Sequence, residues 1–473
     1  MLLLSDVIES LTGTRLEKLS LVISETFVDS RLVIPGAMFV ALPGDRVDGH
    51  QFLNDAFRRG ALFALVNKDL PETYPVLDLR SGTISQDLVI PPTPFCILVN
   101  DPLLSLQQIS GFWRRKLSPV VIGITGSIGK STTKELVGEV LSQRFRTIRN
   151  IGNLNNEIGL PLTLLRLTEG TECAVLEMGF YLPGEISLLC NLALPQIGLV
   201  TNIGPVHAER AGSLEAIAQG KAELLQALPS NPEGVAVLNA DDPLVKAMAD
   251  KTRARVFYYG LDPSADLWAD QIEGLGLAGI RFRLHYRKEI LNLRVPLIGR
   301  HSVHTALRAA AIGLILNLSW HEIIKGLQQG YSQLRLIAVH TKNGALLLDD
   351  TYNASPESNL AALNLLGEIE GRKIAVLGEM YELGPYEVQA HEIVGARVAE
   401  VCDELIAVGE KSKIIVDSAT RAGFPSVQIT WLPGVPETIN FLRNRLHKGD
   451  VVLIKGSRGL AMERIVAALE TSS

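Results

Sequence analysis

The residues best suited to chemistry lie in the segment 120–134, VVIGITGSIGKSTTK, where an apolar run ends in a glycine-rich turn. Gly126 and Gly129 let the backbone approach an anion, which the N–H groups of the turn and of a following helix can hold. Lys130 would reach the β- and γ-phosphates of a nucleotide, and the Ser131 hydroxyl would bind Mg²⁺. The sequence therefore predicts a strand, a phosphate loop and a helix in this order.

Two further polar residues follow predicted strands after this loop. Glu177 ends the apolar run 173–177, and His207 lies just past the run that ends at Thr201. Parallel α/β sheets bind ligands at the carboxyl ends of their strands, and Mg²⁺ takes one or two carboxylates together with phosphates. Glu177 therefore indicates a Mg²⁺ ligand rather than a surface carboxylate. His207 indicates a second metal site or a phosphate contact rather than a structural histidine.

An asparagine-rich segment and a helical lysine are further candidates. The segment 152–156, GNLNN, precedes an apolar helical pattern, and one of its asparagines would cap that helix. The other asparagines would be free to orient a ligand. Lys221 lies in the helical pattern SLEAIAQGKAELL, where spacing alone indicates a solvated side chain.

Two segments near the C-terminal end also place polar groups after strands. In 346–358, LLLDDTYNASPES, an apolar run ends in Asp349 and Asp350, whose repulsion calls for a cationic or hydrogen-bonding partner. This pair indicates binding of a ribose or a substrate. In 455–459, KGSRG, a strand ends in a turn that could hold an anion such as a carboxylate.

The elements that must position these residues alternate between strand and helix. In residues 119–331, the predicted strands after the phosphate loop lie at 147–150, 173–177, 197–201, 235–239 and 255–259. Helical patterns between them indicate a parallel, doubly wound sheet. Alternating polarity over 267–296 indicates added antiparallel strands, and an alanine-rich helix is predicted at 301–316.

The two ends of the chain show similar patterns. Residues 332–473 have predicted strands at 345–348, 373–377, 404–408, 427–431 and 451–454. The first turn there lacks G-x-G-x-x-G, so a Rossmann-like domain without a dinucleotide site is predicted. Residues 1–118 form a smaller α/β unit, with strands at 37–42 and 61–66, helices at 51–59 and 103–116, and a polar loop at 43–50. The predicted fold class is α/β with three domains, at 1–118, 119–331 and 332–473.

Composition limits the classes of function. A chain of 473 residues, 47% hydrophobic and 20% charged, is too long for one core. A formal net charge of −6 argues against a nucleic-acid-binding protein. The four cysteines have no metal or disulfide spacing, which indicates buried free thiols in a reducing compartment. The sequence shows no signal peptide and no apolar run that spans a bilayer, so it predicts a cytoplasmic protein.

These motifs together resemble the Mur ligase family over nearly the whole chain. The segments GITGSIGKSTTK, GNLNNEIGLPLTLL, LEMG, TNIGPVH, GKAELL and LNADD are similar, in order and spacing, to the ATPase domain of the family. The segment DSRLVIPGAMFVALPGDRVDGHQF is similar to its uridine-nucleotide-binding domain. The segments DDTYNASPES, VLGEMYELG and VVLIKGSRG resemble the branch that adds D-alanyl-D-alanine.

The resemblance implies an ATP-dependent ligase of cytoplasmic peptidoglycan precursor synthesis. Its substrates would be UDP-N-acetylmuramoyl-tripeptide and D-alanyl-D-alanine, and it would act as a monomer. ATP would phosphorylate the terminal carboxylate of the UDP-peptide, and the amine of D-alanyl-D-alanine would attack the acyl phosphate through a tetrahedral intermediate. Such a reaction depends on positioning and on charge neutralisation.

The resemblance also implies roles for individual residues. The nucleotide would be held by Gly126, Ser127, Gly129, Lys130, Ser131, Thr132, Asn156, His304, Arg335 and Asp349. The substrates would be held by Ser30, Arg31, Asn353, Lys455, Ser457 and Arg458. Of two Mg²⁺ ions, the first would bind Ser131 and Glu177 and the second His207 and Lys221. Lys221 would be carbamylated, so that an anionic oxygen and not an ammonium group faces the ion.

Some positions depart from the expected patterns, and two alternatives stay open. Ile124 stands where the common phosphate-loop form has its first glycine, and Gly123 is one residue early. Ser302 and His304 stand where the family usually has asparagines, and only the arginine of its Gly-Arg pair is present, as Arg335. The alternatives are a related ligase that adds another amino acid or glutamate, as in folylpolyglutamate-type ligases, and a phosphate-loop switch without turnover.

Overall fold

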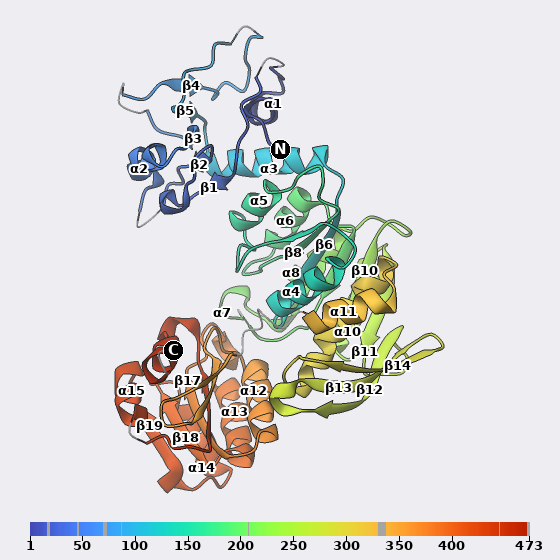
Figure 1. Cartoon of the computed structure of the whole chain (residues 1–473), viewed down its shortest axis with the longest axis vertical. Helices are drawn as coiled ribbons and strands as arrows, with labels where there is room; N and C mark the ends of the chain where they lie inside the picture. Colours follow the sequence, from blue (N-terminus) through green and yellow to red (C-terminus); the bar gives the residue numbers. More distant parts are fainter. Residues whose placement is uncertain are drawn as a thin grey trace.

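The computed structural model describes residues 1–473 apart from 17–18, 45–46, 70–72, 87, 207, 330–336, 444 and 471–473. The described residues form three sheets that follow one another along the chain (Figure 1). Each sheet falls within one of the three predicted domains and is covered by helices, so the predicted α/β fold class is confirmed. The domain boundaries themselves stay predictions.

The first sheet is parallel and has the strand order β1-β2-β3-β5-β4. Asp101 caps the long helix that follows it, because its side chain accepts hydrogen bonds from the backbone N–H groups of Leu103 and Leu104. The elements of this unit are α1 (Leu4–Thr12), β1 (Thr26–Phe27), β2 (Met38–Val40), α2 (Leu53–Arg58), β3 (Phe63–Val66), β4 (Val76–Asp78), β5 (Phe95–Leu98) and α3 (Pro102–Lys116). The strands predicted at 37–42 and 61–66 are confirmed as β2 and β3, whereas the others are too short or too evenly apolar to show a pattern.

The central sheet has the order β14-β13-β12-β11-β10-β9-β6-β8-β7. Neighbouring strands run parallel from β7 to β12, and β12, β13 and β14 are antiparallel, as the sequence predicts. Its strands are β6 (Val120–Thr125), β7 (Thr147–Arg149), β8 (Cys173–Glu177), β9 (Ile197–Val200), β10 (Val235–Asn239), β11 (Arg255–Gly260), β12 (Leu267–Gly274), β13 (Ile280–Tyr286) and β14 (Glu289–Val295).

Helices cover both faces of the central sheet. One face packs against α4 (Lys130–Leu141), α10 (Val303–Ile315) and α11 (Trp320–Gln329), in an apolar cluster that includes Ile122 and Ile124 of β6. The other face, which includes Val121, packs against α3, α5 (Gly159–Leu164), α6 (Glu185–Ala193) and α8 (Leu214–Gln226). Alternation of β6 side chains between two clusters is what a strand buried on both faces requires. The short helices α7 (Ala208–Ala211) and α9 (Pro243–Lys246) complete this unit.

The third sheet has the order β15-β16-β20-β17-β18-β19, with only β15 antiparallel to its neighbour. Its strands are β15 (Ile337–His340), β16 (Leu346–Asp350), β17 (Arg372–Gly378), β18 (Glu404–Val408), β19 (Ile429–Leu432) and β20 (Asp450–Lys455). Its helices are α12 (Pro356–Glu368), α13 (Glu387–Val401), α14 (Lys413–Arg421), α15 (Val435–Arg443) and α16 (Glu463–Leu469). The five predicted strands of this unit are confirmed, and the edge strand β15 was not predicted.

Two further sequence-based predictions concern thiols and membrane spans. All four cysteines are free, and Cys96, Cys173 and Cys190 are buried. Burial raises the pKa of the Cys96 thiol to about 12, so this thiol stays protonated. Within the described part of the chain, every helix falls short of the length and apolarity that a bilayer crossing requires.

The close packing of α11 on α4 yields a stability prediction. A Cβ atom at Gly326 would lie 2.4 Å from the Cα atom of Val140, so Gly326→Ala must push the two helices apart. We expect a loss of about 1–3 kcal/mol, seen as a lower urea midpoint of the central unit. The control is Gly367→Ala near the end of α12, where the new Cβ meets Val401 only at an ordinary 3.4 Å. Equal stability of the two variants would contradict the close helix contact.

Candidate active site

The glycine-rich turn after β6 is held by the segment that follows β9. The N–H of Ser127 donates to the carbonyl of Asn202 at 2.9 Å, and the N–H of Ile128 donates to Asn202 Oδ1, also at 2.9 Å. Gly126 has φ of 141°, and a Cβ there would lie 1.8 Å from Thr201 Oγ1, so no other residue fits. Because β6 lies between β8 and β9, the turn occupies the place where the strand order reverses and where such sheets bind ligands.

The start of α4 completes an anion-binding cradle. Gly129 takes a left-handed conformation, with φ of 77°, at the N-terminal cap of α4. Lys130 folds over the turn, where its Nζ donates to the carbonyl oxygens of Gly126 at 2.9 Å and Ser127 at 3.2 Å. Ser131 and Thr132 follow in the first helical turn and are half-buried. Backbone N–H groups at the positive end of α4 and the Lys130 ammonium group thus converge on one spot.

The irregular first glycine of the motif has a packing explanation. A Cβ at Gly123 would lie 2.7 Å from Leu224 Cδ1, so this glycine allows α8 to cross closely over β6. Ile124, at the next position, is fully buried against the helices on the opposite face. Gly123 is therefore a residue of the core and not a displaced phosphate-loop glycine.

Glu177 ends β8 beside this cradle with only 2% of its surface exposed. Asn150 holds its backbone through two hydrogen bonds of 3.0 Å, and Asn155 Nδ2 donates to Oε1 at 2.9 Å. The other carboxylate oxygen, Oε2, is buried and accepts no hydrogen bond from the described residues. Lys134 Nζ lies 3.9 Å from this oxygen and donates elsewhere. A fixed carboxylate with an unsatisfied oxygen is suited to a divalent cation.

In the asparagine-rich segment, the neighbours Asn155 and Asn156 make different contacts. Asn156 Oδ1 accepts a hydrogen bond from the N–H of Gly159 at 2.9 Å and so caps α5, which confirms that one asparagine is a cap. Asn155, not Asn156, contacts Glu177. A role for Lys134 in the site was not predicted, although this residue lies one helical turn after Lys130. Its Nζ holds the carbonyls of Asn150 and Gly152, which fixes the same segment.

Lys221 is buried, so the expectation of a solvated helical lysine is wrong. It is 1% exposed, and its Nζ lies 4.8 Å from the centre of the Phe180 ring. Burial, and then the positive charge of Lys130, lower the pKa of the Lys221 amine well below its usual range. The sequence could not show this, because Phe180 comes from a different segment. The predicted residues His207 and Arg335 lie outside the described residues.

A hollow of about 400 Å³ lies at the start of α10. His304 stands at its edge, where Nε2 is 2.8 Å from Asp241 Oδ2. The hollow is lined by Leu261, Ile272, Arg300, His301, Val303 and His304. Apolar walls beside a histidine–carboxylate pair fit a flat heterocycle with polar edges.

The third unit reaches the phosphate loop through α12. A Cβ at Gly204 would lie 2.8 Å from Glu357 Oε1, so α12 touches the segment that holds the loop. Behind α12, the Lys455 ammonium group is 1% exposed and lies 2.7 Å from Asp350 Oδ2 and 2.8 Å from the carbonyl of Asn353. Lys455 is thus the cationic partner of Asp350, one of the two adjacent aspartates. Asp349 accepts hydrogen bonds from Thr351 at 2.7 and 3.1 Å.

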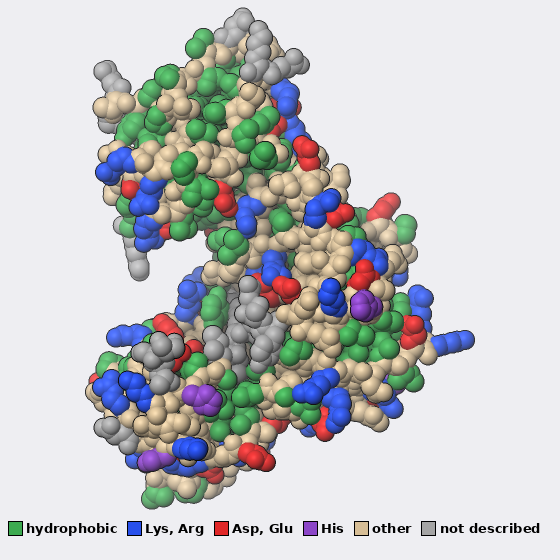
Figure 2. All heavy atoms as spheres, in the orientation of Figure 1, with side chains coloured by type: hydrophobic (Ala, Val, Ile, Leu, Met, Phe, Trp, Pro, Cys, Tyr) green, Lys and Arg blue, Asp and Glu red, His purple; other side chains and the backbone are tan. Residues whose placement is uncertain are grey.

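The remaining predicted residues lie on two other parts of the molecule. Ser457 Oγ accepts a hydrogen bond from the N–H of Tyr381 at 2.9 Å, and exposed Arg458 lies over the Tyr352 ring. In the first unit, Ser30 is buried, and exposed Arg31 pairs with Asp29 at 2.6 Å. The space-filling view is notched between the upper and lower units (Figure 2). The predicted residues therefore occur on all three units.

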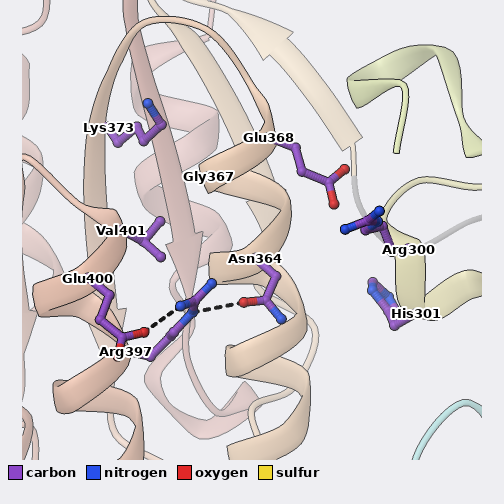
Figure 3. Close-up of a pocket in the computed structure, with 9 residues that line it drawn as sticks. All are labelled: Arg300, His301, Asn364, Gly367, Glu368, Lys373, Arg397, Glu400 and Val401. Atoms are coloured by element: carbon purple, nitrogen blue, oxygen red, sulfur yellow. Dashed lines mark hydrogen bonds and ion pairs between the residues drawn. The ribbon is translucent and has the colours of Figure 1, made fainter. Parts of the chain in front are cut away.

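A second hollow, of about 630 Å³, lies where α12 and α13 face the start of α10 (Figure 3). Arg397 on its wall pairs with Asn364 and Glu400, while Glu368 points toward Arg300 across the gap. None of the predicted site residues lines this hollow. Arg397 is paired within the protein, whereas Oε2 of Glu368 is buried without a hydrogen-bond partner among the described residues, and the hollow lies at an interface between units.

Known protein families and relatives match most of the chain. Three family models match: the Mur ligase family catalytic domain at residues 22–81, the Mur ligase middle domain at 124–313 and the Mur ligase glutamate ligase domain at 334–458. The UDP-N-acetylmuramoyl-tripeptide–D-alanyl-D-alanine ligase of Bacillus subtilis (strain 168) is 34% identical over 454 residues, which cover 95% of this chain and 93% of that protein.

Solved structures agree with the sequence comparison. A crystal structure of MurF from Acinetobacter baumannii has a TM-score of 0.82 and 29% identity, covering 98% of both chains. MurF ligase from Thermotoga maritima in complex with ADP has a TM-score of 0.78 and 26% identity, covering 94% of this chain and 96% of that one. With a relative more than 30% identical over nearly its full length, and with a phosphate loop set in a matching fold, the chain belongs to the Mur ligase family.

Proposed function

We propose that this chain is an ATP-dependent ligase that joins D-alanyl-D-alanine to UDP-N-acetylmuramoyl-tripeptide, with release of ADP and phosphate. The observation that carries the proposal is a phosphate loop beside a buried carboxylate with an unsatisfied oxygen, in a chain that matches a relative named for this activity over 95% of its length. A phosphate loop alone would also suit a nucleotide switch. The two further units, each with polar residues at its strand ends, favour a ligase.

ATP would lie along one edge of the central sheet. Its phosphates would be held by the loop and the first turn of α4, through Gly126, Ser127, Gly129, Lys130, Ser131 and Thr132. The adenine would occupy the hollow beside His304, whose ring is oriented by Asp241. Asn156, Arg335 and Asp349 are proposed to complete the nucleotide site, Asp349 at the ribose.

The metal ions would enter where the protein leaves a carboxylate oxygen unsatisfied. We place the first Mg²⁺ at Ser131 and Glu177, because Oε2 of Glu177 accepts no hydrogen bond from the described residues. The second would be held by His207 and Lys221. When bound, the ions neutralise phosphate charge and so make the reacting phosphorus easier to attack.

Lys221 is suited to carbamylation. Because its pKa is lowered by burial and then by Lys130, its neutral amine is more accessible than that of an exposed lysine. That amine would attack CO₂, form an N–C bond and lose one proton, which leaves an anionic carbamate. The carbamate would supply oxygen ligands for a hard cation.

The acyl substrate and the acceptor would meet between the units. Ser30 and Arg31 would bind the uridine nucleotide on the first unit. Arg458 is exposed, whereas the Lys455 ammonium group is already paired with Asp350. Arg458, with Ser457, would therefore bind the carboxylate of D-alanyl-D-alanine, and Asn353 would lie close to the reacting groups.

The acceptor defines the first test. With ATP, Mg²⁺ and UDP-N-acetylmuramoyl-tripeptide, D-alanyl-D-alanine is expected to give rapid phosphate release and the amide product by mass spectrometry. Single amino acids and glutamate are the matched alternatives. Turnover with one of those and not with the dipeptide would indicate a related ligase, including the folylpolyglutamate type. Nucleotide binding without turnover for any acceptor would indicate a switch.

The second test removes the Lys221 side chain. Lys221→Ala is expected to abolish ligation, because the proposed carbamate ligand is lost. Millimolar formate or acetate should restore part of the rate by filling the vacated space with a carboxylate. Unchanged ligation by the alanine variant, with a normal melting curve, would contradict the proposed metal role.

The third test changes the metal dependence. Glu177→Gln keeps the shape but loses the charge, so the Mg²⁺ concentration for half-maximal rate should rise by about tenfold or more. Glu172→Gln is the matched control, because Glu172 directly precedes the same strand and is 44% exposed at the opposite end. A Glu177→Gln variant with the wild-type Mg²⁺ dependence would rule out Glu177 as a ligand.

A further inference from the structure

Arg308 is a buried cation that none of the roles above uses. It lies on α10, with 6% of its surface exposed, directly behind the phosphate loop. Its Nε donates to the Tyr259 hydroxyl at 2.7 Å, Nη1 to Thr133 Oγ1 at 3.3 Å and Nη2 to the carbonyl of Thr201 at 3.4 Å. These acceptors are neutral. Within the described ranges, no carboxylate lies within ion-pair distance of this guanidinium.

A second buried arginine shows how such a charge can be balanced inside the protein. Arg114 is 4% exposed, and its guanidinium donates to the carbonyls of Leu117, Pro119, Ala193 and Leu194. Leu117 and Leu194 are the C-terminal caps of α3 and α6. Helix C-termini carry partial negative charge, so Arg114 lies where two helices stabilise a cation.

Arg308 lies in the opposite electrostatic environment. Thr133 belongs to the first turn of α4, and a Cβ on Gly129 would be 3.0 Å from Arg308 Nη1. The guanidinium therefore stands at the positive end of α4, next to the segment that also carries Lys130. A buried cation beside a positive helix end and a lysine is costly unless an anion joins it.

We propose that Arg308 binds the phosphates of the nucleotide from behind Gly129, as a second protein cation besides Lys130. This inference rests on the proposed ATP site. His304, at the hollow for the adenine, lies four residues before Arg308 and therefore on the same face of α10. One helix would thus contact the nucleotide at both ends, with His304 at the base and Arg308 at the phosphates.

The role predicts a selective loss of affinity. Arg308→Met keeps the length of the side chain and removes its charge. It should weaken ADP binding about 10- to 100-fold, as expected for loss of a hydrogen-bonded charge, and leave adenosine binding unchanged. Titration calorimetry of the full chain with ADP and with adenosine, both with Mg²⁺, measures the ratio of the two affinities. Arg308→Lys, which keeps a charge without the planar fork, should give an intermediate ratio.

Arg114→Met is the matched control, because it also removes a buried guanidinium. It should lower the melting temperature and leave the ratio of ADP to adenosine affinity as in the wild type. Equal weakening of ADP and adenosine by Arg308→Met would overturn the inference, because a contact to the phosphates affects ADP alone. If Arg308→Met does not fold, a wild-type ratio in Arg308→Lys would overturn it equally. Failure of the wild type to bind ADP would instead overturn the proposed function.

Discussion

The unsatisfied oxygen of the Glu177 carboxylate is the constraint on which the site depends. A buried acceptor without a donor costs free energy, and the surrounding groups hold this carboxylate in place without removing that cost. Asn150 donates a hydrogen bond to the Glu177 backbone, and Asn155 donates one to Oε1 of Glu177. Lys134 donates its hydrogen bonds to the backbone carbonyls of Asn150 and Gly152. Residues of two segments, 150–155 and α4, thus leave one oxygen without a hydrogen-bond donor. A metal-bound nucleotide at the proposed site would offset that cost.

The phosphate loop is held in place by the neighbouring segment 201–204. Gly126 has no room for a side chain against Thr201, and the backbone of the 201–204 segment holds the turn. The same segment meets Glu357 of the third unit at Gly204. The third unit therefore contacts the proposed nucleotide site through the segment that holds the loop. The proposed reaction through an acyl phosphate would have to exclude water, and a site that drew residues from three units would be completed only when those units came together around the ligands.

The three sheets and the phosphate loop could be predicted from the sequence. Buried parallel strands appear as apolar runs, and the glycine-rich turn that carries Lys130 has the residue types and spacing of a phosphate-binding loop. The rest depends on contacts between distant segments. Lys221 has the spacing of a surface lysine, and only the packing of Phe180 shows that it is buried. Asn155 and Asn156 are neighbours of the same type, and the geometry of the turn decides which of them faces Glu177. Arg308 lies in an alanine-rich helix, and its partners come from three other elements.

Four basic side chains and two carboxylates surround the phosphate loop. Lys130, Lys134, Lys221 and Arg308 lie near the start of α4, against the buried carboxylate of Glu177 and the half-buried Glu135. Burial disfavours several cations in one place, and the pKa of the Lys221 amine is lowered first by burial and then by the positive charge of Lys130. A bound polyphosphate would neutralise this local excess of positive charge, because it supplies several negative charges at once. The excess of positive charge around the loop is therefore consistent with the proposed polyphosphate ligand.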